Sequence, residues 1–372
     1  MDTAQAFARL PERADAVVAM ISPAPVRMAF EIVETPAGRS TYEWDAFVAN
    51  QEQGSFYHRY AWRALNEQFF GHRAIYLEAR NGGALAGVLP LVLTRSHVFG
   101  RILCSMPFVN YGGPVSTDEA TAQHLIEAAQ AYAGQLDADY LELRCATPLD
   151  TAMQLSTHKI SMTIELQPDP DQLWSAFTPK HRKNVRRAYK DRLTVISGGR
   201  ELLETFYSVM QRSWRELGTP LYDVGYFEAI LNAFPDCTRI FVCRQDSEPV
   251  AVALVGYHGQ TVEGMWAGTT RAGHDLDANY VLYWDMIKDA CERGFKRFHL
   301  GRSTAGSGAE QFKKKWNAVP NQLYWYYHFP RGYEKSIVNV NHPVFHLAIG
   351  TWRKLPLWMT RRLGPPIARL IP

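Results

Sequence analysis

The residues best suited to binding a ligand or doing chemistry lie in a glycine-rich loop, LGRSTAGSGAEQFKKKW, at residues 300–316. Its three glycines allow the backbone to approach a ligand closely, and its arginine and lysines can meet negative charge. The loop is not a nucleotide-triphosphate loop, because Gly306 is followed by serine and glycine rather than by the Gly-Lys-Ser/Thr of that motif. We therefore predict that Arg302, Ser303 and Lys313 grip a phosphate or carboxylate.

Three further residues are candidates for handling a proton or a carbonyl group. His58 lies in an aromatic stretch, and its ordinary pKa near ~6.5 suits a general base, although a packed or capping histidine fits the same pattern. Asn110 and Tyr111 precede a Gly-Gly-Pro turn that would present both side chains from a loop. An ordinary structural turn is the alternative.

Large aromatic residues in the second half of the chain could form the wall of a sugar or peptide site, although aromatics at such spacing also form cores. The candidates for substrate contacts there are Trp266, Asn279, Tyr280 and Trp316.

A basic segment at residues 180–190 is predicted to be helical, with a dense positive face that carries Lys180, Arg182, Arg186 and Lys190. Such a face either binds an anionic substrate or is simply solvated and paired with nearby aspartates. Both interpretations stay open at this point.

Several classes of chemistry have no motif in this sequence. There is no G-x-S-x-G elbow, no H-E-x-x-H pair and no C-x-x-C pair, and the five cysteines are widely spaced. We expect no metal and no resident cofactor, reduced thiols and a cytoplasmic location, because no signal segment and no run of ~18 apolar residues is found. The net charge of +3 requires any anionic partner to be met by a local patch.

Two pieces of the chain recur in the same order, which predicts an internal duplication. Residues 74–93 and 239–258 each have the pattern of a β-hairpin. Residues 124–144 and 282–302 each have a helical period that runs into a strand. Because the two offsets are nearly equal, we predict a repeated unit of hairpin, helix and strand.

The order of these elements resembles the GNAT acyltransferase fold, and four motifs resemble the FemAB-type transferases, which are tandem GNAT enzymes that extend peptidoglycan side chains with aminoacyl-tRNA. The motifs are LWSAFTPKHRKNVRRAYKD, FYSVMQRSWRELGTPLYDVGYF, YVLYWDMIKDACERGFKRFHLG and FKKKW. The resemblance implies a mixed α/β fold of two tandem GNAT-like domains with a cleft between them. We expect an N-terminal extension (1–25), domain 1 (26–165), domain 2 (166–340) and a tail (341–372).

More narrowly, SFYHRYAW, PFVNYGGP and GRSTAGSG resemble a FemAB-like branch associated with exopolysaccharide and PEP-CTERM (exosortase) gene clusters. The first of these segments adds Tyr57, Arg59 and Trp62 as candidate substrate contacts. One departure stands out: His299 takes the place of the aspartate that FemAB proteins carry in their final strand. A role of that aspartate is therefore not transferred to this chain.

The resemblance implies an acyl or aminoacyl transferase that modifies an amine or hydroxyl of a cell-envelope or exopolysaccharide precursor. The alternative is a catalytically silent module that binds a glycan or a partner. The donor is a co-substrate, aminoacyl-tRNA or acyl-CoA: the basic helix favours tRNA, and the usual CoA-binding motif is not found convincingly. The acceptor is expected to be a small molecule or a lipid-linked glycan or peptide precursor.

The C-terminal residues 344–372 combine tryptophans and leucines with arginines and contain no acidic residue. This composition suits the anionic inner face of the cytoplasmic membrane, and it also suits a brace packed across the domains. Because of Pro356, Pro365 and Pro366, we expect short helical pieces rather than one long helix.

Overall fold

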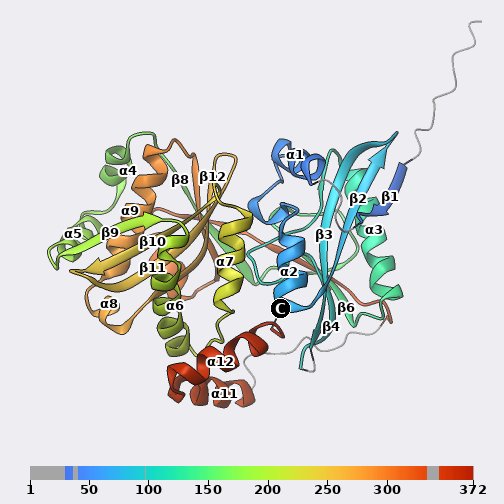
Figure 1. Cartoon of the computed structure of the whole chain (residues 1–372). Coiled ribbons are helices and arrows are strands. Elements are labelled where there is room, and N and C mark those ends of the chain that lie inside the picture. Colours follow the sequence, from blue (N-terminus) through green and yellow to red (C-terminus); the bar gives the residue numbers. More distant parts are fainter. Residues whose placement is uncertain (1–29, 37–40, 97, 333–342, 372) are drawn as a thin grey trace, which may run out of the picture.

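The computed structural model describes residues 30–36, 41–96, 98–332 and 343–371. Two mixed α/β halves lie side by side, and a pair of C-terminal helices lies below them in the view of Figure 1. The predicted extension at residues 1–25 lies outside the described residues.

The first half is built on one sheet with the strand order β1-β2-β3-β4-β6-β15-β7, in which β5 also pairs with β3. Its elements are β1 (Phe30–Glu34), α1 (Tyr42–Asn50), the 3₁₀ helix η1 (Phe56–His58), α2 (Trp62–Phe70), β2 (Arg73–Asn81), β3 (Ala84–Ser96), β4 (Gly100–Cys104), β5 (Val115–Ser116), α3 (Glu119–Gln135), β6 (Tyr140–Cys145), β7 (Gln154–Ser156) and β15 (Tyr324–His328).

The second half is built on a sheet with the order β14-β8-β13-β12-β11-β10-β9. Its elements are β8 (Lys159–Glu165), α4 (Pro170–Ala176), α5 (Pro179–Tyr189), β9 (Leu193–Gly198), the 3₁₀ helix η2 (Arg200–Leu202), α6 (Leu203–Leu217), α7 (Val224–Ala233), β10 (Thr238–Gln245), β11 (Glu248–His258), β12 (Thr261–Thr269), α8 (Arg271–Asp275), α9 (Ala278–Glu292), β13 (Arg297–Thr304), α10 (Gly308–Lys314) and β14 (Val319–Gln322).

The predicted duplication is confirmed by the strand pairings. In the first half, the hairpin β2–β3 turns at Gly82 and Gly83, which both adopt the positive φ that a tight hairpin turn requires. In the second half, the hairpin β10–β11 turns at Asp246 and Ser247, and Asp246 also has positive φ. Each hairpin is followed by an antiparallel strand, a helix and a strand parallel to the previous one: β4-α3-β6 and β12-α9-β13.

The two halves exchange strands, so the predicted domain boundary at residue 165 does not separate the two sheets. β8 precedes that boundary but pairs with β13 and β14 of the second sheet. β15 follows the second half in sequence but inserts between β6 and β7 of the first sheet. Up to β15, the described chain therefore crosses from one sheet to the other twice, once between β7 and β8 and again between β14 and β15.

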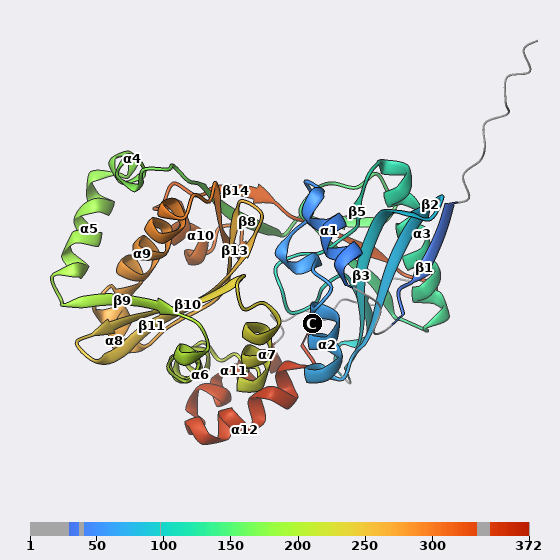
Figure 2. The same cartoon turned by 45° about the horizontal axis from the view of Figure 1, so that its top comes forward.

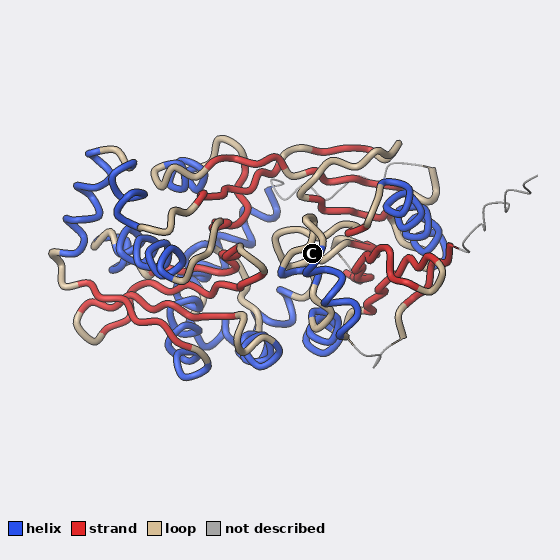
Figure 3. Tube along the Cα trace, turned by 90° about the horizontal axis from the view of Figure 1, so that it is seen from above, coloured by secondary structure: helices blue, strands red, loops and turns tan. Residues whose placement is uncertain are grey.

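A shared hydrophobic core fixes the halves to each other. One buried cluster combines Phe56 and Trp62 of the first half with Phe227 and Phe234 of the second. The ring centroids of Phe56 and Phe234 lie 4.8 Å apart. Gly256 allows this contact, since a Cβ there would lie 2.8 Å from the Phe56 ring. Figures 2 and 3 show the halves side by side from two other directions, with the C-terminus between them.

Candidate active site

A cavity of about 1440 Å³ lies between the two halves. Tyr57 and Asn110 line it from the first half, and Trp266 and residues 300–304 line it from the second. The cleft predicted between the two domains is therefore present. Its size is sufficient for a substrate much larger than an amino acid.

The cavity enters the second sheet where two parallel strands separate. β12 and β13 pair only over Thr261–Glu263 and Arg297–His299. Beyond that point β12 contains a β-bulge at Met265. Leu254 pairs with Trp266 and Val255 with Gly264, so Met265 has no partner on β11. The residues that follow on both strands, 264–267 and 300–304, line the cavity. The opening between these two separating strands is called the wedge below. It brings backbone groups of a rigid sheet to the site, where they can orient a carbonyl group.

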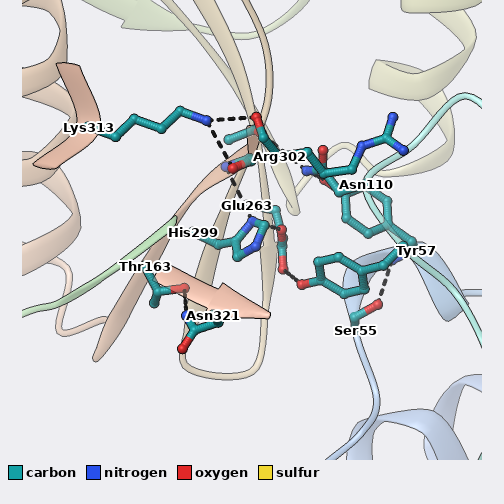
Figure 4. A network of polar contacts seen from close by, with 12 residues as sticks. Ser55, Tyr57, Asn110, Thr163, Glu263, His299, Arg302, Lys313 and Asn321 are labelled. Atoms are coloured by element: carbon teal, nitrogen blue, oxygen red, sulfur yellow. Dashed lines mark hydrogen bonds and ion pairs between the residues drawn. The ribbon is translucent and has the colours of Figure 1, made fainter. Parts of the chain in front are cut away.

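At one end of the cavity, polar side chains from the first half reach the wedge. Asn110 Nδ2 donates a hydrogen bond to Tyr57 Oη at 2.7 Å and lies 3.4 Å from the carbonyl oxygen of Gly264. Gly301, with φ of +77°, stands beside them, and a Cβ there would lie 3.1 Å from the Gly264 oxygen. Glycine therefore permits the close approach of loop and wedge that Figure 4 shows.

A second polar chain, almost wholly buried, connects the halves beside this point. Tyr111 Oη donates to Glu263 of β12, and the other oxygen of Glu263 lies 3.0 Å from His299 Nδ1 on β13. His299 occupies the position of the missing aspartate, so the carboxylate at this place comes instead from the neighbouring strand. None of the three residues lines the cavity, and their contacts support the loop that carries Asn110.

Lys313 is the most deeply placed cation of the glycine-rich loop. Its Nζ donates to the carbonyl oxygens of Gly301 and Arg302, both at 2.9 Å. Burial, and to a lesser degree the charge of Arg302, lowers its pKa to about 8. An ammonium group has three donors, so one remains beyond the two carbonyls among the described residues. Lys313 can therefore offer a positive charge and a proton donor to the cavity.

Arg302 and Ser303 also lie on the cavity wall. Burial, with a contribution from Arg144, lowers the pKa of Arg302 to about 10. Ser303 is 6% exposed, and its Oγ has no hydrogen-bond partner among the described residues. An unpaired buried hydroxyl at a cavity wall suits a polar ligand, because burying it unpaired is otherwise costly.

The structure corrects the expectation for His58. Its ring is 2% exposed, Nε2 donates to the Gly113 carbonyl at 3.2 Å, and Nδ1 accepts from Ser55 Oγ at 2.7 Å. Burial lowers its pKa to about 4, so the ring is neutral. With both nitrogens occupied, and with no part in the cavity wall, His58 fixes the Gly-Gly-Pro turn rather than accepting a proton from substrate.

Other predicted substrate contacts also lie away from the cavity. Trp62 and Trp316 are fully buried core residues, since the large apolar area of an indole is stabilised best inside. Arg59 stacks on Phe234, Tyr280 bonds to Lys315, and Asn279 bonds to Thr269. Of the aromatic and amide candidates in the second half, only Trp266 lines the cavity.

The basic helix α5 lies at the outer end of the second half, away from the first half, in both Figure 1 and Figure 2. None of Lys180, Arg182, Arg186 and Lys190 lines the cavity. Arg182 donates to the carbonyls of Ser175 and Phe177, and Arg186 lies over the Trp174 ring. The stripe is thus remote from the site, although Lys180 and Lys190 are exposed to solvent.

The C-terminal segment forms α11 (Pro343–Lys354) and α12 (Leu357–Ala368), separated at Pro356 as expected. Pro365 and Pro366 lie inside α12 instead of ending it; the carbonyls they leave without a donor belong to exposed residues and can meet water. The pair packs on α6, where Gln211 donates to the Leu357 carbonyl and Arg215 to the Leu355 carbonyl. Its end reaches the first half at His72, and Ile371 lines the cavity. The segment therefore braces both halves.

Sequence reasoning missed a second set of cavity residues, which comprises Glu142, Arg144, His158, Lys159, Trp214, Tyr222 and Trp325. Only Glu142 and Arg144 had a signal, because these two charged residues alternate with apolar residues inside the otherwise apolar strand β6. His158, Lys159 and Trp325 reach the site through the strand exchange, and Trp214 and Tyr222 reach it from α6 and from the loop before α7. Neither arrangement has a local sequence signature.

Within the described residues, no group of three or more histidine, cysteine or carboxylate side chains could hold a metal ion. The same part of the chain contains no helix long and apolar enough to cross a lipid bilayer.

Comparisons with known proteins agree with this architecture. The acetyltransferase (GNAT) domain family matches residues 179–314. The lipid II:glycine glycyltransferase of Staphylococcus aureus (strain MRSA252) is 25% identical over 211 residues, which are 51% of this chain and 50% of that protein. The chain thus spans about half the length of the curated relatives it matches.

Solved structures share the fold over most of the chain. FemX superposes with a TM-score of 0.61 at 16% identity and covers 86% of this chain and 100% of FemX. A tandem GNAT protein from the clavulanic acid biosynthesis pathway superposes with a TM-score of 0.52 at 11% identity, covering 82% of this chain and 100% of that one. The chain is therefore a tandem GNAT-fold protein, similar in sequence and in fold to FemAB-like transferases.

Proposed function

We propose that the protein transfers an acyl or aminoacyl group to an amine or hydroxyl of a cell-envelope precursor. The observation that carries the proposal is the cavity between the halves, which combines the β12–β13 wedge with an unpaired hydroxyl and buried cations. Acyl transfer needs little covalent machinery: a nucleophile held against a carbonyl, a stabilised oxyanion and a route for one proton. The similarity to lipid II:glycine glycyltransferase supports the same reaction class.

The residues at the wedge can divide this work. Asn110 and Tyr57 can orient the nucleophile or the donor carbonyl, since both polar groups lie at the cavity wall. Lys313 can stabilise the negative charge that develops on the carbonyl oxygen. Ser303 can accept or donate a hydrogen bond to substrate through its free Oγ. The buried chain of Tyr111, Glu263 and His299 holds the Asn110 loop in place.

We propose aminoacyl-tRNA as the donor and acyl-CoA as its alternative, each as a co-substrate and not as a resident cofactor. The exposed lysines of α5 favour a polyanionic donor such as tRNA, which would have to reach from the outer end of the second half to the wedge. For the acceptor we propose a lipid-linked peptide or glycan precursor, including the exopolysaccharide precursors of the PEP-CTERM-associated branch. Such an acceptor would place the protein at the inner face of the cytoplasmic membrane.

The test is a transfer assay read by mass spectrometry. Purified full-length protein is incubated with lipid II or an exopolysaccharide precursor, and separately with a mixture of charged tRNAs or with acetyl-CoA. We expect a mass increase on the acceptor equal to one aminoacyl or acyl group, and we expect its loss in Lys313→Gln. If no donor labels any acceptor while the protein is folded, the proposal fails, and a catalytically silent binding module becomes the better explanation.

A further inference from the structure

A cluster of cations lies at the end of the cavity where the chain crosses between the halves. The guanidinium carbons of Arg144 and Arg302 lie 4.5 and 5.6 Å from the centre of the Trp325 ring. The His158 ring meets the same indole edge-on at 4.8 Å. Lys159 donates to Thr304 Oγ1 at 2.9 Å, next to Arg302 on β13. All six of these residues line the cavity.

Negative charge is scarce around this cluster. Arg144 is 3% exposed and pairs with Glu142, which is the only acidic residue among those that line the cavity. Neither Lys159 nor Arg302 has a carboxylate partner in the described part of the chain. Burial and the neighbouring arginines lower the pKa values of both. Three positive charges thus face one carboxylate, and two remain uncompensated in a partly buried site.

The neighbouring polar groups are also available. Besides Ser303 Oγ, the Trp325 indole nitrogen is buried without a hydrogen-bond partner among the described residues. The His158 side chain stays accessible to solvent, while its partial burial and the charge of Lys159 lower its pKa. Its Nδ1 lies 2.8 Å from Ser156 Oγ, so Nε2 is the ring nitrogen that can donate to a ligand. Unpaired buried donors next to uncompensated cations indicate an anion that accepts several hydrogen bonds.

We propose that Arg144, Lys159 and Arg302, with His158 and Ser303, form a binding subsite for the phosphate or diphosphate group of a substrate. Two uncompensated charges match a dianion better than a single carboxylate, and a phosphoryl group has enough oxygens for a planar guanidinium and an ammonium together. Lys313, by contrast, is held by the carbonyls of the wedge and belongs to the transfer site. The subsite adds detail to the proposed function. The statement that the bound anion belongs to a substrate rests on that function.

The subsite is assembled from both halves. Arg144 and Trp325 belong to the first sheet, whereas Lys159 and Arg302 belong to the second, and His158 lies in the crossover between β7 and β8. A bound phosphoryl group would therefore contact both sheets at the place where the chain exchanges strands. The substrate would be held by its phosphate at this end, with its reacting group toward the wedge.

The experiment is isothermal titration calorimetry of full-length protein at constant ionic strength. The probes are inorganic pyrophosphate, with acetate as the carboxylate comparison. We expect pyrophosphate to bind more tightly than acetate, and we expect Arg302→Gln and Lys159→Gln each to weaken it by about tenfold or more. Arg302→Lys should bind more tightly than Arg302→Gln but less tightly than the unaltered protein, because a point charge replaces a two-pronged donor.

The matched control is Lys296→Gln, which removes an exposed cation that does not line the cavity. Equal weakening by this variant, or pyrophosphate binding no tighter than acetate binding, would overturn the subsite. Two further probes distinguish the source of the phosphate: uridine diphosphate represents a soluble nucleotide-linked substrate, and farnesyl diphosphate represents a lipid-linked one. The one that binds more tightly than pyrophosphate, and loses that binding in Arg302→Gln, identifies the substrate class.

Binding and transfer are separable in this design. Pyrophosphate binding with no transfer to any acceptor would remove the proposed function and leave the subsite. Transfer that is unaffected by Arg302→Gln and Lys159→Gln, without pyrophosphate binding, would remove the subsite and leave the proposed function.

Discussion

At the scale of single residues, Lys313 offers the sharpest test of the chemistry, because its pKa of about 8 lies within an accessible pH range. If the protonated ammonium stabilises the oxyanion, kcat/KM falls as the pH rises through 8, since the charged form is then lost. Lys313→Arg keeps its charge above that pH, so the decline near pH 8 should disappear. Lys313→Gln should reduce kcat/KM by about 100-fold at pH 7, the usual effect of losing one oxyanion donor.

Lys296→Gln is again the control, since it removes an exposed lysine that lies outside both the cavity wall and α5. A pH profile that is the same for Lys313→Arg and the unaltered protein would assign the decline to another group, and Lys313 would then have only a structural role.

Tyr111 tests the buried connection between the halves. Replacement by phenylalanine removes the hydroxyl donor to Glu263, which is 2% exposed and cannot recover the bond from water. We expect the free energy of unfolding to fall by about 1–3 kcal/mol, the cost of leaving a buried acceptor unsatisfied. Urea unfolding provides the measurement. Tyr42→Phe, at a side chain that is 82% exposed, should change the midpoint very little; an equal effect of the two variants contradicts this role.

At the scale of elements, the helix pair α11–α12 can serve as a brace and as a membrane-binding surface at once, because the two uses need different faces. Thr360, Gly364 and Ala368 of α12 are buried at a spacing of four and form its inner face. Trp358 is 68% exposed on the outer face, with exposed Arg362 four residues later. An exposed indole among arginines suits the headgroup region of an anionic bilayer.

Co-sedimentation with phosphatidylglycerol-containing vesicles measures this second use. We expect Trp358→Ser together with Arg362→Gln to reduce binding by several-fold, since each cation near an anionic surface is worth about 1 kcal/mol. Tyr42→Ser removes an even more exposed aromatic residue on α1 and should bind as before. Negligible binding of the unaltered protein would leave α11 and α12 with the brace alone. These variants are preferable to removing the segment, because its inner face supports α6.

At the scale of the whole molecule, the strand exchange and the shared core predict that the two halves unfold together. Phe56 and Phe234 belong to different halves but to one buried cluster, and β15 cannot leave the first sheet without disturbing β14. Urea unfolding followed by tryptophan fluorescence and by far-UV circular dichroism should therefore give one midpoint. Phe56→Ala should lower that midpoint for both signals, at a cost of about 3–5 kcal/mol. Two separated midpoints would mean that the halves are independent.

The sequence by itself determined the repeated unit, because hairpins and helix–strand units depend on local sequence patterns. Paired glycines at 82–83 and a turn at 246–247 fix where each hairpin reverses, and the apolar period fixes which face is buried. It also identified Asn110, Arg302, Ser303 and Lys313, since glycine-rich loops that carry polar side chains are local features too. These residues line the cavity.

Only the tertiary structure decided how distant segments meet. Lys159 and Trp325 reach the site because β8 and β15 lie in the sheet opposite to the one that sequence order suggests, and non-local pairing of this kind is fixed by packing across the whole molecule. The same holds for the exclusions. His58 is not available as a base, because its Nε2 is hydrogen-bonded to the carbonyl of Gly113, 55 residues away in sequence. The charges of α5 lie far from the cavity because of the direction in which that helix packs. The sequence could not show this, since a charge pattern identifies a solvated face but not what lies opposite it.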